Sequence, residues 1–225
     1  MARLARVVVP GIPHHVTQRG NRRSPVFWSD EDYQAYFDLL FAAIKNSGTE
    51  VWAYCFMPNH VHMILVPEDE DGLRATFADA HRQYTRRINA RNKWTGHLWQ
   101  GRFGSVAMDE EHLANAIIYV SLNPVRAGLV DKAEHWKWSS VQGQLGLKED
   151  ALLSRAPVDI RLPDFPQRLR SGDDVALSDR LRKSETTGRP VGAKKWLQEM
   201  EVKTGRQLQA QKPGPKIQAK SMRIK

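Results

Sequence analysis

Apolar residues recur at two different periods along the first half of this chain. Residues 30–46 and 72–92 carry them at intervals of three and four, which predicts two amphipathic helices. Apolar and β-branched runs start near His14, cover residues 51–57 and 60–66, and return among the glycines of residues 97–108. These runs predict four strands, the last with a bulge. Residues 110–120 predict a further helix that ends around Asn123 and Pro124.

The central stretch of this pattern is residues 51–66, VWAYCFMPNHVHMILV. Pro58 and Asn59 favour a tight turn because proline fixes its own φ and asparagine tolerates unusual backbone angles, so the two apolar arms predict a β-hairpin. The resulting order of elements is β-α-β-β-α-β. This order predicts an α+β ferredoxin-like sandwich, in which two helices cover one side of a four-stranded sheet.

Three parts of the chain differ in composition. Residues 1–108 hold the predicted sandwich, and residues 109–147 supply a helical, tryptophan-containing extension that we expect to pack on it. From about residue 148 the apolar period fades, so residues 148–225 predict a basic C-terminal region that is partly disordered. Residues 180–225 hold 13 Lys or Arg and 3 Asp or Glu, a net charge of +10, whereas the preceding 179 residues have a net charge of −1.

Composition also excludes several classes of protein. The single cysteine, Cys55, lies in an apolar run, which excludes an internal disulfide and a cysteine-rich zinc site and indicates a buried residue in a reducing compartment. The chain has neither the apolar core of a secretory signal nor an uninterrupted apolar run of membrane-spanning length. We therefore expect a cytoplasmic protein with no membrane partner.

Two histidines open the second arm of the hairpin. Side chains alternate along a strand, so His60 and His62 point to the same side of the sheet. Two neutral imidazoles at this spacing can bind a divalent cation if further donors come from elsewhere in the fold. The simpler alternative is that both rings form hydrogen bonds at a half-buried surface.

A tyrosine in the middle of the second predicted helix is the candidate nucleophile. Tyr84 lies in a run without acidic residues between Ala80 and Asp109. A phenol with a pKa near 10 attacks phosphorus only when a cation polarises the phosphate, and the histidine pair could hold that cation if the apolar side of the helix faces it. Alternatively, Tyr84 is only one more core residue. Asn89 is the best candidate for a third metal ligand, with Gln83, His81 and His15 as alternatives.

Basic and aromatic residues alternate in Arg82–Trp94 and in HLWQGRF, and a loop rich in Gly, Asn and Pro carries further arginines. This mixture suits a nucleic acid backbone with unstacked bases, although solvated helix faces have a similar composition. The predicted DNA-binding residues are Arg19, Arg22, Arg23, Arg82, Arg86, Arg87, Arg91 and Arg102.

Several motifs together resemble one family. They are GIPHHVTQRGNRRSPVF, MPNHVHMILV, QYTRRIN, GHLWQGRFGS, YVSLNPVRAGLV and WKWSS, within residues 8–142. In these motifs the chain resembles the single-tyrosine HUH transposases, and among them the bacterial REP-associated tyrosine transposases. The resemblance implies a ferredoxin-like nuclease that binds Mg²⁺ or Mn²⁺ through His60 and His62. It also implies that Tyr84 attacks single-stranded DNA to form a 5′-phosphotyrosine link and a free 3′-hydroxyl.

The implied substrates are short imperfect palindromes that fold as hairpins beside a tetranucleotide guide, bound by a monomer or homodimer at the nucleoid. One departure concerns the third ligand, because insertion-sequence relatives place a polar ligand four residues after the tyrosine, and that position is Ile88 here. Two other functions stay open from the residues alone. One is a hairpin-binding nucleic-acid regulator without turnover, and the other is a metal phosphoesterase that uses activated water.

Overall fold

The computed structural model describes residues 4–209 of this 225-residue chain. Its sheet has four strands in the order β2-β3-β1-β4, with every neighbouring pair antiparallel. The strands are β1 (His14–Arg19), β2 (Glu50–Met57), β3 (His60–Val66) and β4 (Gly104–Ala107). With α1 (Asp30–Ser47) after β1 and α2 (Gly72–Asn92) after β3, the order is β-α-β-β-α-β, and the predicted ferredoxin-like sandwich is confirmed.

The hairpin at the centre of the sheet has the predicted turn. Met57 pairs with His60, so Pro58 and Asn59 alone connect β2 to β3. The hairpin also receives the loop after β1, because the Gly20 amide donates to the Asn59 carbonyl at 2.8 Å. This loop contains the short 3-10 helix η1 (Asn21–Arg23), so its arginines lie at the end of the sheet where β3 begins.

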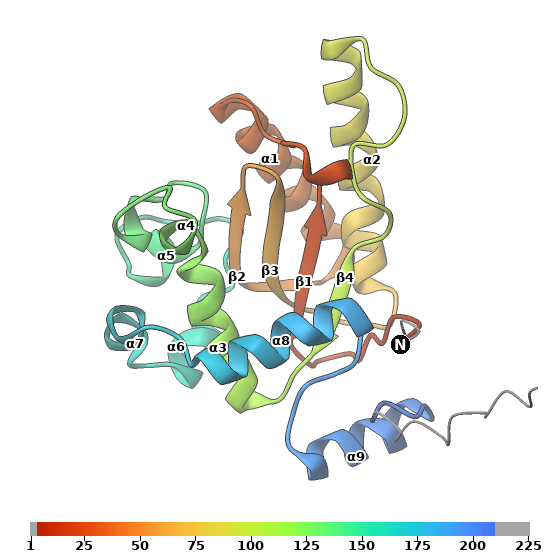
Figure 1. The fold of residues 1–225 in the computed structure, drawn as a ribbon, viewed down its shortest axis with the longest axis vertical. Helices are drawn as coiled ribbons and strands as arrows, with labels where there is room; N and C mark the ends of the chain where they lie inside the picture. The colour runs from red at the N-terminus through yellow and green to blue at the C-terminus, as the bar shows by residue number, and fades with distance from the viewer. Residues whose placement is uncertain (1–3, 210–225) are drawn as a thin grey trace, which may run out of the picture.

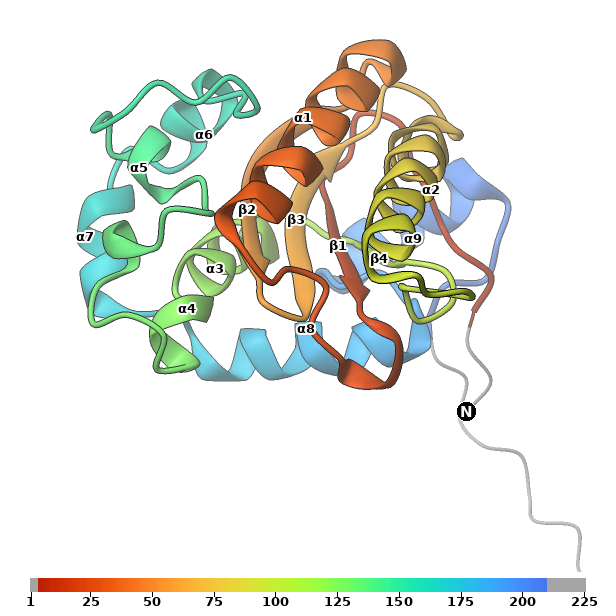
Figure 2. The ribbon, with the colours of Figure 1, turned by 90° about the horizontal axis from the view of Figure 1, so that it is seen from above.

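Helices α1 and α2 cover one face of the sheet (Figure 2). The core between them contains Val16, Met63 and Leu65 from the strands and Leu40 and Phe77 from the helices, all at most 1% exposed. These strand residues alternate with the histidines of β1 and β3 along the chain. His15, His60 and His62 therefore point to the opposite face, whereas His14, two residues before Val16, is on the same face as Val16.

The opposite face is covered by the region after β4 (Figure 1). Helix α3 (Glu110–Ser121) packs there on Cys55 and Ile64, and α8 (Val175–Thr187) crosses β4 and α3 with Leu181 buried. Both faces of the sheet are thus covered. The remaining short elements are α4 (Asn123–Arg126), η2 (Ala133–His135) and α5 (Val141–Gln144).

The C-terminal region contains more regular structure than its fading apolar period indicated. Besides α8 it forms α6 (Ala156–Arg161), α7 (Phe165–Ser171) and α9 (Lys194–Thr204). Each helix is short and contributes only one or two buried apolar residues, a signal too weak to read as a period. The disorder expected at the chain end concerns residues 210–225, which lie outside the described residues. Among helices in residues 4–209, none combines the length and apolar content of a membrane span.

Candidate active site

The two histidines of β3 lie on the sheet face covered by α3 and α8. His60 is half-buried at the hairpin end, and His62 is 4% exposed. Strand register places Arg19 opposite His60 and Thr17 opposite His62, so these side chains share the same face. The ring centroids of His60 and His62 are 4.9 Å apart. The predicted convergence of two imidazoles is therefore present.

Each imidazole has one nitrogen occupied by a protein partner. Nδ1 of His60 lies 2.5 Å from Oδ1 of Asn59, and Nδ1 of His62 lies 2.9 Å from Nε2 of His15. No hydrogen bond to the other nitrogen, Nε2, is found in either ring within residues 4–209, so Nε2 can bind a ligand. Burial lowers the pKa of His60 to about 4, with a further contribution from the positive charge of Arg19, and it lowers the pKa of His62 well below its ordinary value. Both rings are thus neutral at neutral pH, which is the form that binds metal.

A tyrosine from α3 lies beside these rings. The ring of Tyr119 meets the ring of His62 edge to face at a centroid distance of 5.8 Å, and it meets His15 at 6.1 Å. The guanidinium of Arg126 lies 4.3 Å from the Tyr119 ring centroid, in cation–π geometry. Burial raises the pKa of the Tyr119 phenol, and the carboxyl of Glu185 raises it further.

One helical turn after Tyr119 comes an amide side chain. The Leu122 amide donates to the Ile118 carbonyl and the Ala127 amide to the Asn123 carbonyl, so α3 continues into α4 with nearly helical hydrogen bonding. Four residues rotate the chain by about 400°, so Asn123 lies within about 40° of the direction of Tyr119. Its Nδ2 atom is buried and has no hydrogen-bond partner in the described part of the chain.

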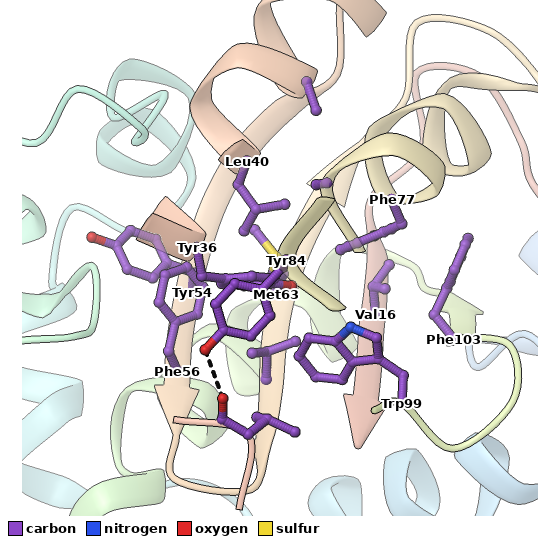
Figure 3. Packing of buried hydrophobic residues seen from close by; sticks show 14 of the residues in the cluster. Val16, Tyr36, Leu40, Tyr54, Phe56, Met63, Phe77, Tyr84, Trp99 and Phe103 are labelled. Atoms are coloured by element: carbon purple, nitrogen blue, oxygen red, sulfur yellow. Dashed lines mark hydrogen bonds between the residues drawn. The ribbon is translucent and has the colours of Figure 1, made fainter. Parts of the chain in front are cut away.

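The expectation that the Tyr84 hydroxyl meets the histidine pair is wrong for this structure. Tyr84 is fully buried on the opposite face of the sheet, where its ring packs against Tyr36 and Trp99 (Figure 3). Its hydroxyl donates a 2.6 Å hydrogen bond to the backbone carbonyl of Val26, drawn as the dashed line in Figure 3. Burial also raises the pKa of this phenol. Tyr84 is therefore a core residue, which was the simpler alternative.

Asn89, the expected third ligand, belongs to α2 and therefore also lies on the sheet face opposite the histidine pair. Its Nδ2 donates to the Gly96 carbonyl at 3.0 Å. Of the alternatives, Gln83 bonds Asp79 on its own helix, and the His81 ring pairs with the Tyr36 hydroxyl at 2.9 Å. Only His15 is found beside His62.

The arginines predicted to bind DNA fall into two groups. Arg19 is next to His60, and the exposed Arg22 and Arg23 lie in η1, whose end is held to Asn59. The other group lies on and beside α2, across the sheet: Arg82, Arg86, Arg87, Arg91 and Arg102. Two of these hold carboxylates, Arg82 pairing with Asp79 and Arg91 with the fully buried Asp32. Arg82 and Arg102 line a surface pocket of about 510 Å³ with His97 and Trp99.

Residues 8–123, more than half of the chain, match the family model of IS200-like transposases. The chain belongs to the IS200-like transposase family. A Haemophilus influenzae protein, provisionally named a REP-associated tyrosine transposase, is 30% identical over an alignment of 102 residues, and the match covers 40% of this chain. The match covers 58% of that relative's length. A solved structure of a REP-associated tyrosine transposase bound to a REP hairpin superposes with a TM-score of 0.57 at 22% identity. It covers 68% of this chain and 92% of that one, which shows that the two share a fold.

The sequence reasoning did not single out Tyr119, Asn123 or Arg126, although all three lie within the motif YVSLNPVRAGLV. The apolar residues around Tyr119 made the helix look like ordinary core. A signal was nevertheless present, because the insertion-sequence relatives in the resemblance place a polar ligand four residues after their tyrosine. Tyr84 fails this test at Ile88, and Tyr119 meets it at Asn123.

Proposed function

We propose that this transposase is a divalent-metal-dependent endonuclease and strand transferase that cleaves and rejoins single-stranded DNA beside hairpins. The proposed nucleophile is Tyr119, and the proposed metal ligands are His60, His62 and Asn123. The observation that carries the proposal is the position of the Tyr119 ring, which lies 5.8 Å from the His62 ring on the same face of the sheet.

The donor set fits Mg²⁺ or Mn²⁺. In His60 and His62, Nδ1 is hydrogen-bonded and the neutral Nε2 can bind a metal. Asn123 offers its amide oxygen, and its Nδ2 has no hydrogen-bond partner in the described chain. A mixture of imidazole and oxygen ligands suits such ions, with water or phosphate oxygens completing the shell. When bound, a divalent cation supplies Lewis-acid polarisation of the scissile phosphate.

The side chain of Tyr119 would carry the covalent step. Its raised pKa keeps the hydroxyl protonated at neutral pH, so the proton leaves Oη as the new Oη–P bond forms. The bond from phosphorus to the 3′ oxygen breaks at the same centre, and that oxygen ends as a 3′-hydroxyl. The products are a 5′-phosphotyrosine and a free 3′ end. The reverse attack by another 3′-hydroxyl rejoins DNA and restores Tyr119, so no bond energy is lost between the two steps.

Two further facts support single-stranded hairpin DNA as the substrate. The solved structure that shares this fold is described as bound to a REP hairpin. In this chain the exposed Arg22 and Arg23 lie at the hairpin end of the sheet, with Arg19 directly beside His60. Arginine side chains at that position can hold the phosphates that flank a scissile bond near the histidines. A protein acting on such DNA would work at the nucleoid.

The test is a covalent-adduct assay with the full-length protein. A hairpin oligonucleotide with single-stranded flanks, labelled at its 3′ end, is incubated with Mn²⁺ or Mg²⁺ and resolved under denaturing conditions. We expect a labelled protein–DNA adduct in the wild type and in Tyr84→Phe. The adduct should be absent from Tyr119→Phe and strongly reduced in His60→Ala and Asn123→Ala.

Other outcomes would point elsewhere. Hairpin binding without cleavage or adduct would favour a regulator that has lost turnover. Cleavage that persists in Tyr119→Phe without an adduct would favour a phosphoesterase that uses water. Circular dichroism of each variant controls for unfolding.

A further inference from the structure

A third histidine lies behind His62 and is not part of the proposed metal site. His15 is 1% exposed and projects from β1 onto the same face. Its Nε2 lies 2.9 Å from Nδ1 of His62, and the two ring planes differ by only 1°. The centroid separation of 5.1 Å exceeds the nitrogen–nitrogen distance by about two ring radii, so the rings meet edge to edge rather than face to face. This is the geometry of an in-plane N–H···N hydrogen bond.

The other edge of His15 faces a carboxylate from the C-terminal region. Its Nδ1 lies 3.5 Å from Oε1 of Glu185, which α8 carries across the sheet. Both atoms are buried, and neither has a hydrogen-bond partner within residues 4–209. Leaving two buried polar atoms unpaired is unfavourable, so a small approach of the two groups that forms the hydrogen bond is favoured.

We propose that Glu185 and His15 form a relay that fixes the tautomer and orientation of His62, and this inference rests on the metal site proposed above. Burial raises the pKa of the Glu185 carboxyl to about 7, and above that pH the ionised carboxylate only accepts hydrogen bonds, so Nδ1 of His15 donates to it. A neutral imidazole has one donor, so Nε2 of His15 accepts from Nδ1 of His62. Nε2 of His62 then keeps its lone pair for the cation. His15 and Glu185 are positioning residues that act through His62.

The arrangement at His60 supports the same logic. There Oδ1 of Asn59, which is also an acceptor, holds Nδ1 of the ring. Metal-binding histidines commonly donate their second nitrogen to a carboxylate, carbonyl or similar acceptor, which raises ligand basicity and holds the ring in place. The relay also gives α8 a role beyond covering the sheet, because its Glu185 completes the support of the metal ligands.

The first measurement is the tautomer of His62 in the metal-free, full-length protein labelled with ¹⁵N-histidine. Long-range ¹H–¹⁵N NMR correlations distinguish the two tautomers, and a His62→Gln sample assigns the signals. The relay requires a proton on Nδ1 and none on Nε2. A His62 ring protonated on Nε2 would overturn it. This measurement uses the unmodified chain, so it does not depend on whether a variant folds.

The second measurement is Mn²⁺ affinity by titration calorimetry without DNA. His15→Leu has a similar volume but no polar atom, and we expect Mn²⁺ binding to weaken about 10–100-fold. His15→Gln, whose amide oxygen can accept from His62, should stay within about threefold of the wild type. Glu185→Leu, which has no hydrogen-bond acceptor for His15, should weaken binding, whereas Asp179→Leu, at an exposed acid on the same helix paired with Arg182, should not.

Failure of the relay and failure of the proposed function give different results. Equal Mn²⁺ affinity in the wild type and His15→Leu would overturn the relay even if the DNA adduct still forms. A wild type that binds Mn²⁺ with the expected tautomer but never forms an adduct would overturn the transposase chemistry and leave the relay standing.

Discussion

Phenylalanine substitutions at Tyr84 and Tyr119 should have opposite effects on stability and chemistry. Tyr84→Phe keeps the ring but removes a hydroxyl that donates to the Val26 carbonyl at 2.6 Å in a fully buried position. That carbonyl then has no donor among the described residues. Tyr119→Phe removes a hydroxyl that has no hydrogen bond in the described chain, while its ring contacts with His62 and Arg126 stay.

The magnitudes follow from these environments. Losing a buried hydrogen bond and leaving its acceptor unpaired should cost Tyr84→Phe about 2 kcal/mol of unfolding free energy. For a chain of this size that corresponds to a fall in Tm of about 4–8 °C. Tyr119→Phe should change stability by less than about 0.5 kcal/mol. The first variant should nevertheless form the covalent DNA adduct, and the second should form none.

Two assays on the same protein samples check this. Thermal unfolding followed by circular dichroism gives Tm, and denaturing electrophoresis with a labelled hairpin and Mn²⁺ gives the adduct. The reasoning is refuted if Tyr84→Phe loses the adduct at an unchanged Tm, or if Tyr119→Phe keeps it. Either result would mean that the chemistry does not take place on the α3 face of the sheet.

Three further predictions concern charge. Arg91→Met should lower the free energy of unfolding by about 2–4 kcal/mol in urea titrations, because it leaves the buried Asp32 carboxylate without its positive partner. The control Arg86→Met should leave stability unchanged and weaken DNA binding. Equal losses of stability in the two variants would contradict this. Burial lowers the pKa of His14 from 6.5 to about 4, so the folded state resists its protonation. The free energy of unfolding should therefore fall by about 3 kcal/mol as the pH drops from 6.5 to 4, because the unfolded chain takes up the proton first. His14→Gln should make stability less dependent on pH in this range. A variant with the wild-type pH slope would exclude His14 as the cause. Deleting residues 210–225, which hold five Lys or Arg and no acids, should flatten the salt dependence of hairpin affinity, and an unchanged slope would exclude the segment as a phosphate contact.

Local sequence patterns were sufficient for the sandwich and for half of the candidate site. The turn at Pro58 and Asn59 depends only on its own backbone preferences, and the observed bounds of α2 are those the apolar period indicated. Strand alternation alone places His60 and His62 on one face. The arginines at the hairpin end follow from the same local signals.

The nucleophile could not be chosen in this way, because α2 and α3 each carry a tyrosine among apolar residues. Helical periodicity states which side of a helix is buried, but it does not state which face of the sheet the helix packs against. The tertiary structure decided that question: Tyr84 of α2 faces the core between α1, α2 and the sheet, and Tyr119 lies beside the histidines on the other face.

The sequence by itself determined the strands, the two sandwich helices, the turn and the pairing of His60 with His62, since each depends on residues close together in the chain. Only the tertiary structure brought Tyr119, His15 and Glu185 to that pair. The physical reason is that their contacts join segments distant in sequence, and such contacts depend on how the helices pack rather than on any local period.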